Sequence, residues 1–228
     1  MRTQPRVGAR HGKVVDQRGF TAVEVVMVMV ISMAVAAMAI PGYSAMMRYL
    51  RIAGDVRDLN ATVAQAKMRA AQDFTHARVH ANLATNTYAL EVWDKTAGCW
   101  KTEGDSVNRC TVAASPAQNL SPRVSFGFGT AAPGGLNPQT AIAQAPACSN
   151  GVGGGAASST ISGSTACIEF NSRGLPVAGN GLPNSGSPTT NDALYITDEN
   201  TVYGVTVIIS GLIQIWTTTS SGNNWQAR

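Results

Sequence analysis

The sequence from Arg18 to Glu24 reads Arg-Gly-Phe-Thr-Ala-Val-Glu, and a long apolar run follows it. Between Val25 and Met47 the chain has 23 residues without Asp, Glu, Lys or Arg. As an α-helix this run would be about 35 Å long, at roughly 1.5 Å per residue, which is enough to cross a bilayer. Glu24 lies just inside the amino-terminal edge of the run. A carboxylate at membrane depth costs on the order of 2.5–3.5 kcal/mol on insertion scales, so we expect this acid to have a purpose.

The helical pattern continues beyond the apolar run. Apolar residues recur there at spacings of three and four, which is typical of the buried face of an amphipathic helix. They are Ile52, Val56, Leu59, Val63, Ala66, Ala70 and Phe74. Pro41 lacks a backbone N–H and clashes with the preceding turn, so we expect a kink there. The sequence thus predicts one helix from Phe20 to about Phe74, whose second half packs on a β-sheet.

Short strand-like runs follow the helix. They are Arg78–Leu83, Thr87–Trp93, Cys99–Lys101, Val124–Phe128, Thr165–Phe170, Ala193–Thr197, Val202–Ser210 and Leu212–Thr217. The last two runs flank Gly211 and predict a hairpin or one long bulged strand. Gly, Pro and Ser are frequent in residues 129–165 and 178–191, which predicts surface loops, and the tail from Ser220 to Arg228 is polar. The predicted fold class is α+β, with a long kinked helix packed on an antiparallel sheet.

The basic charge of the chain belongs to its first residues. The formal net charge is +4. Residues 1–19 hold five basic side chains and one acidic side chain, whereas residues 20–228 hold twelve of each. Positive charge stays on the cytoplasmic side of a membrane span, which favours a single-pass protein with the first residues inside and the bulk outside. The neutral remainder argues against strong binding to nucleic acid, because that affinity comes largely from phosphate neutralisation.

The four cysteines all lie in the part that is expected to be exported. An even number of cysteines in an oxidising compartment predicts two disulfides, and three pairings are possible. We favour Cys99–Cys110 and Cys148–Cys167, because each pair closes a loop in a turn-rich stretch.

Catalytic and metal-binding signatures have little support in the sequence. Neither GxSxG nor HExxH occurs, and the glycines at 151–155 lack the Gly-Lys-Ser/Thr of a phosphate-binding loop. His76 and His80 are four residues apart, but no Cys or acid completes a metal site. The scattered acids are most simply solvated surface groups. They are Glu91, Asp94, Glu103, Asp105, Glu169, Asp192, Asp198 and Glu199. We therefore expect a protein that is not an enzyme and holds no metal or cofactor.

The Gly-Phe junction, the Thr, the acid five residues after the Gly and the uncharged helix together resemble the leader and first helix of type IV pilins and type II secretion pseudopilins. The resemblance covers residues 18–47, in which residue types, order and spacing agree. It implies cleavage after Gly19 by a prepilin peptidase and N-methylation of Phe20. It also implies that Glu24 pairs with the terminal amine of a neighbouring subunit during assembly, and Pro41 lies near the place where the family's helix carries a proline.

The second half of the chain resembles one branch of that family, the GspH/FimT-type pseudopilins. The resemblance rests on Ile168-Glu169-Phe170 before Arg173-Gly174, on the run from Val205 to Gly211 before a last strand, and on Ala64–Lys67 near the helix end. Some FimT-type members carry a Gly-Arg-x-Arg motif linked to DNA binding. The corresponding stretch, Gly211–Gln214, has no Arg, so nucleic-acid binding by that route is not expected.

The resemblance implies three segments: a cleaved leader at residues 1–19, a transmembrane and assembly segment at 20–47, and a periplasmic pilin-like domain at 48–228. It implies a structural subunit, a minor pilin or pseudopilin, in the bacterial inner membrane and then in a pilus or pseudopilus. The expected partners are other subunits, the prepilin peptidase and N-methyltransferase, the inner-membrane assembly platform and membrane lipid.

Four other interpretations stay open. Residues 34–36 and 37–39 are small-x-small sites that an ordinary signal peptidase would use, which would leave a soluble periplasmic protein. A plain membrane anchor would explain the apolar span and leave Glu24 incidental. A DNA-binding or adhesin module at a pilus tip and a membrane-anchored periplasmic enzyme are the alternatives from other functional classes.

Overall fold

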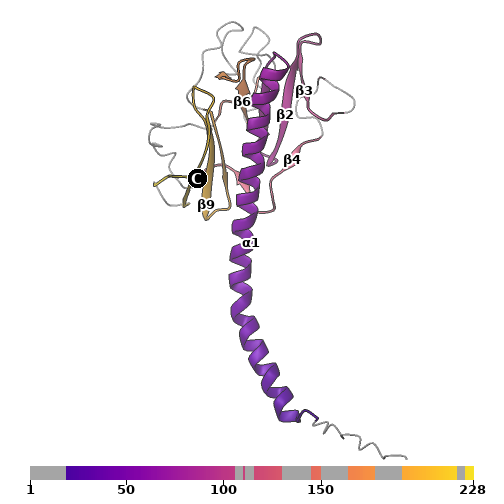
Figure 1. Cartoon of the computed structure of the whole chain (residues 1–228), viewed down its shortest axis with the longest axis vertical. Coiled ribbons are helices and arrows are strands. Elements are labelled where there is room, and N and C mark those ends of the chain that lie inside the picture. Colours follow the sequence, from indigo (N-terminus) through magenta and orange to yellow (C-terminus); the bar gives the residue numbers. More distant parts are fainter. Residues whose placement is uncertain are drawn as a thin grey trace, which may run out of the picture. The chain divides into compact units, whose positions relative to one another are not determined.

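The structure is a computed structural model that describes residues 19–105, 110, 116–129, 145–149, 164–177, 192–219 and 224–228. The chain divides into two compact units, Met1–Met46 and Met47–Arg228. Helix α1 (Ala22–Gln72) runs through both units, and the strands belong to the second (Figure 1).

Helix α1 has recognisable contacts at both ends. The Thr21 hydroxyl accepts a hydrogen bond from the Glu24 main-chain N–H at 3.3 Å, as an N-cap residue does. At the other end, the Thr75 N–H donates to the Ala70 carbonyl at 3.1 Å, and Phe74 takes a left-handed φ of 49°. This is a Schellman arrangement with Phe where Gly is usual. The helix continues without a break across Pro41. The kink expected at Pro41 stays a prediction.

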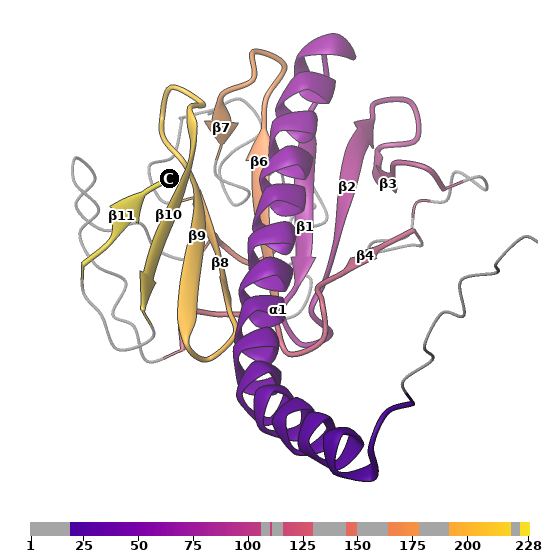
Figure 2. The same cartoon turned by 60° about the horizontal axis from the view of Figure 1, so that its bottom comes forward.

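The strands of the described chain form two antiparallel sheets (Figure 2). They are β1 (Ala77–Asn82), β2 (Thr87–Asp94), β3 (Cys99–Thr102), β4 (Gln118–Asn119), β5 (Ser125–Phe126), β6 (Thr165–Phe170), β7 (Pro176–Val177), β8 (Asp192–Thr197), β9 (Thr201–Val207), β10 (Ile213–Thr219) and β11 (Gln226–Ala227). The first sheet has the order β3-β2-β1-β6-β7, with β4 paired to β2, and the second has the order β11-β10-β9-β8-β5. The chain is therefore α+β, as predicted.

The second half of α1 packs its apolar stripe against both sheets. Ile52, Leu59 and Val63 are fully buried in one cluster with residues of β1, β2, β6, β8 and β9. Every position of the predicted stripe is buried except Phe74, which is 75% exposed. Phe74 lies past the last helical residue, where the left-handed backbone turns it away from the face that the stripe occupies.

The prediction of a surface loop over residues 129–165 is wrong where the structure describes that segment. Ala145 and Cys148 are buried, and the Ala145 N–H donates to the Ala193 carbonyl on β8 at 2.7 Å. The partners of this segment are far away in the sequence, and its Gly- and Ser-rich surroundings do not reveal them. Residues 130–144 and 150–163, and the loop predicted at 178–191, lie outside the described residues.

The carboxy-terminal tail is not simply polar, which corrects the interpretation of residues 220–228. Trp225 is buried, and β11 after it pairs with β10. The Trp225 and Tyr195 rings lie 5.6 Å apart. At Gly204 an added Cβ would lie 2.8 Å from the Tyr195 ring, so the glycine makes room for these aromatic rings on the second sheet.

The structure places the cysteines in the two predicted pairs. Cys99 is bonded to Cys110 with their Cα atoms 5.5 Å apart, and Cys148 is bonded to Cys167 with their Cα atoms 4.9 Å apart. The second disulfide joins segment 145–149 to β6. It therefore fastens to the first sheet a segment that also contacts β8 of the second.

Replacing Cys148 and Cys167 together by Ser is expected to lower the free energy of unfolding by about 3 kcal/mol, because the bridge closes a loop in the unfolded chain. Thermal unfolding of the full chain in a mild detergent, followed by circular dichroism, measures the change. The Cys99→Ser/Cys110→Ser variant is the matched control. Its loss is expected to be smaller, because Cys110 is exposed whereas Cys148 and Cys167 are both buried. Unchanged unfolding in the first variant would contradict this account.

Candidate functional site

The amino-terminal end of α1 holds the residues predicted for processing and assembly. Gly19, Phe20 and Thr21 precede the helix and are exposed, with 81% of Phe20 accessible. Glu24 lies in the first turn of the helix. A carboxylate in the first turn is stabilised by the helix dipole and the free main-chain N–H groups there. In the first unit, the predicted cleavage junction and the predicted assembly acid therefore lie within about one helical turn of each other.

Thr21 and Glu24 also match the pattern of a capping box. In that pattern an N-cap Ser or Thr is followed three residues later by Glu or Gln. The hydrogen bond from the Glu24 N–H to the Thr21 hydroxyl supplies the N-cap half of it. The Thr-x-x-Glu signature before an apolar run could have predicted this role from the sequence. The pattern predicts that the Glu24 carboxylate supplies the other half by accepting a hydrogen bond from the Thr21 main-chain N–H.

The first half of α1 presents apolar side chains around its whole circumference. After Glu24, no charged residue occurs before Arg48, and the large apolar side chains from Val25 to Met46 that the structure describes are exposed. A helix that is apolar on all sides is typical of a protein core or a membrane span. Among the described residues, α1 is the one helix long and apolar enough to cross a membrane.

A buried polar cluster lies on the first sheet, on the face opposite Val79. Arg78 and Glu91 are fully buried, and Arg78 Nε donates to Glu91 Oε2 at 2.6 Å. The guanidinium carbon lies 4.0 Å from the centroid of the Trp100 ring. Arg78 Nη1 also donates to the Ser149 carbonyl. Arg78 therefore ties segment 145–149 to the sheet through a charge-assisted hydrogen bond.

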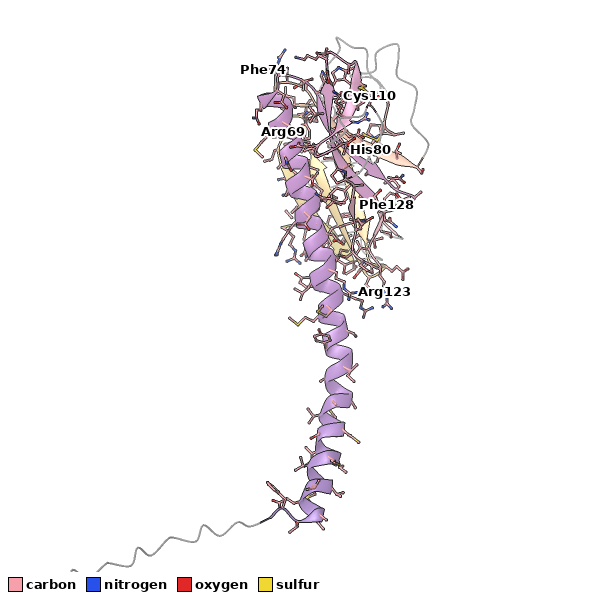
Figure 3. The ribbon with its side chains drawn as sticks, turned by 90° about the vertical axis from the view of Figure 1, so that its right-hand side faces the viewer. Arg69, Phe74, His80, Cys110, Arg123 and Phe128 are labelled. Atoms are coloured by element: carbon pink, nitrogen blue, oxygen red, sulfur yellow. A yellow bond between two sulfur atoms is a disulfide. The ribbon has the colours of Figure 1, made fainter. Side chains whose placement is uncertain are left out.

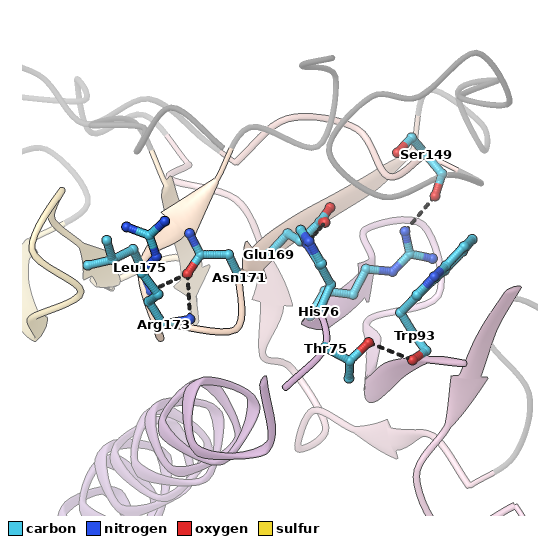
Figure 4. A network of polar contacts seen from close by, with 9 residues as sticks. Thr75, His76, Trp93, Ser149, Glu169, Asn171, Arg173 and Leu175 are labelled. Atoms are coloured by element: carbon cyan, nitrogen blue, oxygen red, sulfur yellow. Dashed lines mark hydrogen bonds and ion pairs between the residues drawn. The ribbon is translucent and has the colours of Figure 1, made fainter. Parts of the chain in front are cut away.

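A second buried acid belongs to the same cluster. Glu169 Oε1 lies 2.8 Å from His76 Nδ1, and the carboxyl group is almost fully buried (Figure 4). The antiparallel registers place Arg78 opposite both Glu91 and Glu169 on neighbouring strands.

The expectation that the scattered acids are solvated surface groups is therefore wrong for Glu91, Glu169 and Asp192, each of which is at most 1% exposed. Buried carboxylates persist where cations or hydrogen-bond donors reach them. Cross-strand pairing brings Arg78 to Glu91 across a separation of 13 residues. His76, directly before β1, reaches Glu169 across a separation of 93 residues. The sequence displays neither contact.

His76 and His80 do not share a site. His76 contacts Glu169, whereas His80 lies on β1 and is 2% exposed. His80, Cys148 and Cys167 place their ligand-type atoms within 4.8 Å of one another, which the sequence spacing did not indicate. The two sulfurs are bonded to each other, however, and a thiolate is the form that binds metals. The cluster in its oxidised form is therefore not a metal site.

Burial lowers the pKa of His80; the Glu91 carboxylate opposes this effect, and the Arg78 cation adds to it. Because the folded pKa lies below the unfolded value near 6.5, the unfolded chain binds more protons between the two values. The stability from neutral His80 is thus fully present above pH 6.5 and is lost as the pH falls through the folded pKa, with a slope of at most about 1.4 kcal/mol per pH unit. The melting temperature of the full chain in detergent should therefore fall over this range. The melting temperature should fall less with pH in His80→Gln than in the wild type. Equal falls in the two proteins would contradict the assignment of this effect to His80.

Comparisons with protein-family models, with curated proteins and with solved structures found no match to this chain. What the protein does is therefore inferred from its residues. Of the residues predicted for function, Gly19, Phe20 and Glu24 lie together at the start of α1, while the cysteines lie in disulfides of the second unit.

Proposed function

We propose that the chain is a structural subunit of a type IV pilus or a type II secretion pseudopilus, a minor pilin or pseudopilin of the GspH/FimT type. The observation that carries the proposal is the junction at Gly19 and Phe20, followed by Glu24 and an uncharged helix. The exposed, non-helical backbone at Gly19 and Phe20 supports it, because a peptidase needs an extended and accessible chain.

The assembly chemistry follows from the charges at the helix start. Cleavage after Gly19 gives Phe20 a positive terminal amine, which the methyltransferase then methylates. Glu24 lies about one turn further along the helix and deeper in the membrane. When subunits pack side by side, an unpaired carboxylate becomes more costly because water is excluded, and the Phe20 amine of a neighbouring subunit neutralises it.

The architecture of the chain supports the same function. One helix has an apolar first half, which requires lipid or neighbouring subunits, and an amphipathic second half packed on two antiparallel sheets. This is the division expected for a pilin-like protein, in which the helix both anchors the subunit and forms the filament core. The two disulfides fit a domain in an oxidising compartment such as the periplasm.

The proposal assigns partners by this chemistry. Other subunits pack against the apolar half of α1, the prepilin peptidase acts at Gly19, and the inner-membrane assembly platform receives the processed subunit. The Gly211–Gln214 stretch has no arginine, so DNA binding through a Gly-Arg-x-Arg motif is not part of the proposal.

Processing is the first expected result. The protein extracted from membranes should begin at Phe20 and carry one methyl group on its terminal amine. Intact-mass analysis and sequencing of the terminal peptide measure both. The Gly19→Leu variant is the control, because a bulky residue there should block cleavage and leave the leader attached. A mature terminus after Ala36 or Ala39 would instead identify an ordinary signal peptide and would refute the proposal.

A further inference from the structure

A cavity of about 500 Å³ opens in the second unit beside the first turns of α1 that belong to it. Arg48 and Arg51 line it from the helix, Arg123 lines it from the loop before β5, and Asp198 and Glu199 line it from the turn between β8 and β9. Four segments that are far apart in the sequence therefore meet around it, the fourth being the β1–β2 turn at Asn86.

The backbone around this cavity is unusual. Asn86, Arg123 and Glu199 have left-handed φ angles of 55°, 71° and 73°. Phe74 is the fourth left-handed residue other than glycine that the structure describes, and it lies at the opposite end of the unit from Arg123 (Figure 3). Asn adopts this conformation readily, but Arg and Glu do not. Such strain is found preferentially at functional sites, where the position of the side chain matters.

The charges of the cavity are largely available to a ligand. None of the ion pairs between described residues involves Arg48, Arg51 or Arg123. Asp198 Oδ1 accepts main-chain hydrogen bonds from Asn200 and Thr201 at 3.0 and 2.7 Å, which fixes the turn that carries Glu199. The Glu199 side chain is exposed. The cavity thus offers three guanidinium groups beside two carboxylates.

The position of the arginines along the chain indicates the kind of ligand. Arg48 directly follows the uncharged run that ends at Met47. In a chain anchored by this run, Arg48 and Arg51 lie at the depth of the lipid headgroups, where arginine binds phosphate. A phosphate alone would not engage the Glu199 carboxylate, which is exposed beside the arginines. A headgroup that carries both a phosphodiester and a primary amine satisfies both sets of charges.

We propose that this cavity binds the headgroup of phosphatidylethanolamine, with the phosphodiester on Arg48, Arg51 and Arg123 and the ammonium group on Glu199 and Asp198. The proposal rests on membrane anchoring by α1 and is independent of filament assembly. The choline headgroup cannot donate hydrogen bonds to the carboxylates, and the glycerol headgroup carries no cation to pair with them.

The test uses the full chain in nanodiscs of phosphatidylcholine that contain equal fractions of phosphatidylethanolamine and phosphatidylglycerol. Native mass spectrometry counts the lipids that stay bound after the protein is released from the disc. The wild type should retain phosphatidylethanolamine several-fold more than either other lipid. The triple variant Arg48→Gln/Arg51→Gln/Arg123→Gln should lose this retention, and Glu199→Gln should lose the preference for phosphatidylethanolamine over phosphatidylcholine. Equal retention of all three lipids, or no effect of either variant, would overturn the proposal.

Two controls separate binding from folding and from other ligands. Arg123→Gly removes a side chain from a left-handed position, so it should unfold at the same or a higher temperature than the wild type while it retains less lipid. Unchanged lipid retention in this variant would count against the site.

Soluble phosphoethanolamine should compete only weakly, and strong binding of it without a bilayer would reject the lipid as the source. Loss of subunit crosslinks in the triple variant, without any lipid preference, would assign the cavity to a protein partner and overturn the proposal. Recovery of the protein in the nanodiscs measures membrane insertion separately. A wild type that inserts but shows no lipid preference would therefore overturn the headgroup site without contradicting membrane anchoring or processing.

Discussion

Replacing Arg78 by Met is expected to lower the free energy of unfolding by about 3–5 kcal/mol, the largest effect on stability that we expect from a single side chain. Arg78 is fully buried, lies 2.6 Å from Glu91 through its Nε, stacks on Trp100 and donates to the Ser149 carbonyl. Methionine keeps much of the apolar stem but leaves the Glu91 carboxylate buried without its cation. The loss of the positive charge, rather than of volume, therefore determines the effect.

The double variant Arg78→Met/Glu91→Leu is the matched control. Replacing both members of a buried ion pair by apolar residues is often neutral, so the double variant should recover most of the stability that the single variant loses. Lys101→Met is a second control. Lys101 pairs with Asp94 where both side chains are partly accessible, and such pairs contribute little. Thermal unfolding of the full chain in detergent measures all three variants. A single variant that is as stable as the wild type would contradict the pairing of Arg78 with Glu91.

Replacing Glu24 by Ala is expected to reduce incorporation into the assembled filament at least about a hundredfold. The Phe20 amine of the neighbouring subunit would then be buried without its carboxylate, at a cost of about 3–5 kcal/mol, and each 1.4 kcal/mol changes an equilibrium constant about tenfold. Membrane insertion should persist, because Ala is easier to insert than Glu. Cleavage should also persist if the peptidase recognises mainly Gly19. The expected product is a processed subunit that stays in the membrane.

The position of Glu24 in a capping-box pattern requires a control of its own. Gln is accepted at the third position of a capping box, so Glu24→Gln keeps the helix start and removes only the charge. If charge neutralisation drives assembly, Glu24→Gln should fail as Glu24→Ala does. Crosslinking or pull-down at equal membrane abundance measures the incorporation of each variant. Normal incorporation of Gln with failure of Ala would assign Glu24 to capping alone.

The helix and most strands could be predicted from the sequence because their signals are local. The uncharged run from Val25 to Met47 and the stripe from Ile52 to Ala70 each follow from spacing within one element. The run from Thr165 to Phe170 coincides with β6, because alternating and β-branched residues favour strands wherever they lie. The cysteine pairs could also be predicted, because each disulfide joins cysteines that are nearest in the sequence and closes a short loop.

What could not be predicted depends on pairing between distant residues. Glu91 and Glu169 look like ordinary surface acids until the register of β1 with β2 and β6 places Arg78 between them. The burial of segment 145–149 depends on the disulfide to β6 and on the hydrogen bond to β8. The cavity lined by Arg48, Arg123 and Glu199 likewise combines four segments. The left-handed backbone at Arg123 and Glu199 has no sequence signature, because glycine or asparagine would be expected there.

The pairing of Glu24 with a neighbouring amine is tested most directly by zero-length carbodiimide crosslinking of assembled filaments, which joins a carboxylate to an amine only when the two are in contact. Filaments are assembled from a mixture of isotope-labelled and unlabelled subunits, and the crosslinked peptides are identified by mass spectrometry. We predict a peptide that joins the Phe20 amine of one subunit to Glu24 of another, seen as a labelled–unlabelled pair. Finding Phe20 joined to Glu24 only within single subunits, or finding no such peptide in assembled material, would contradict the account.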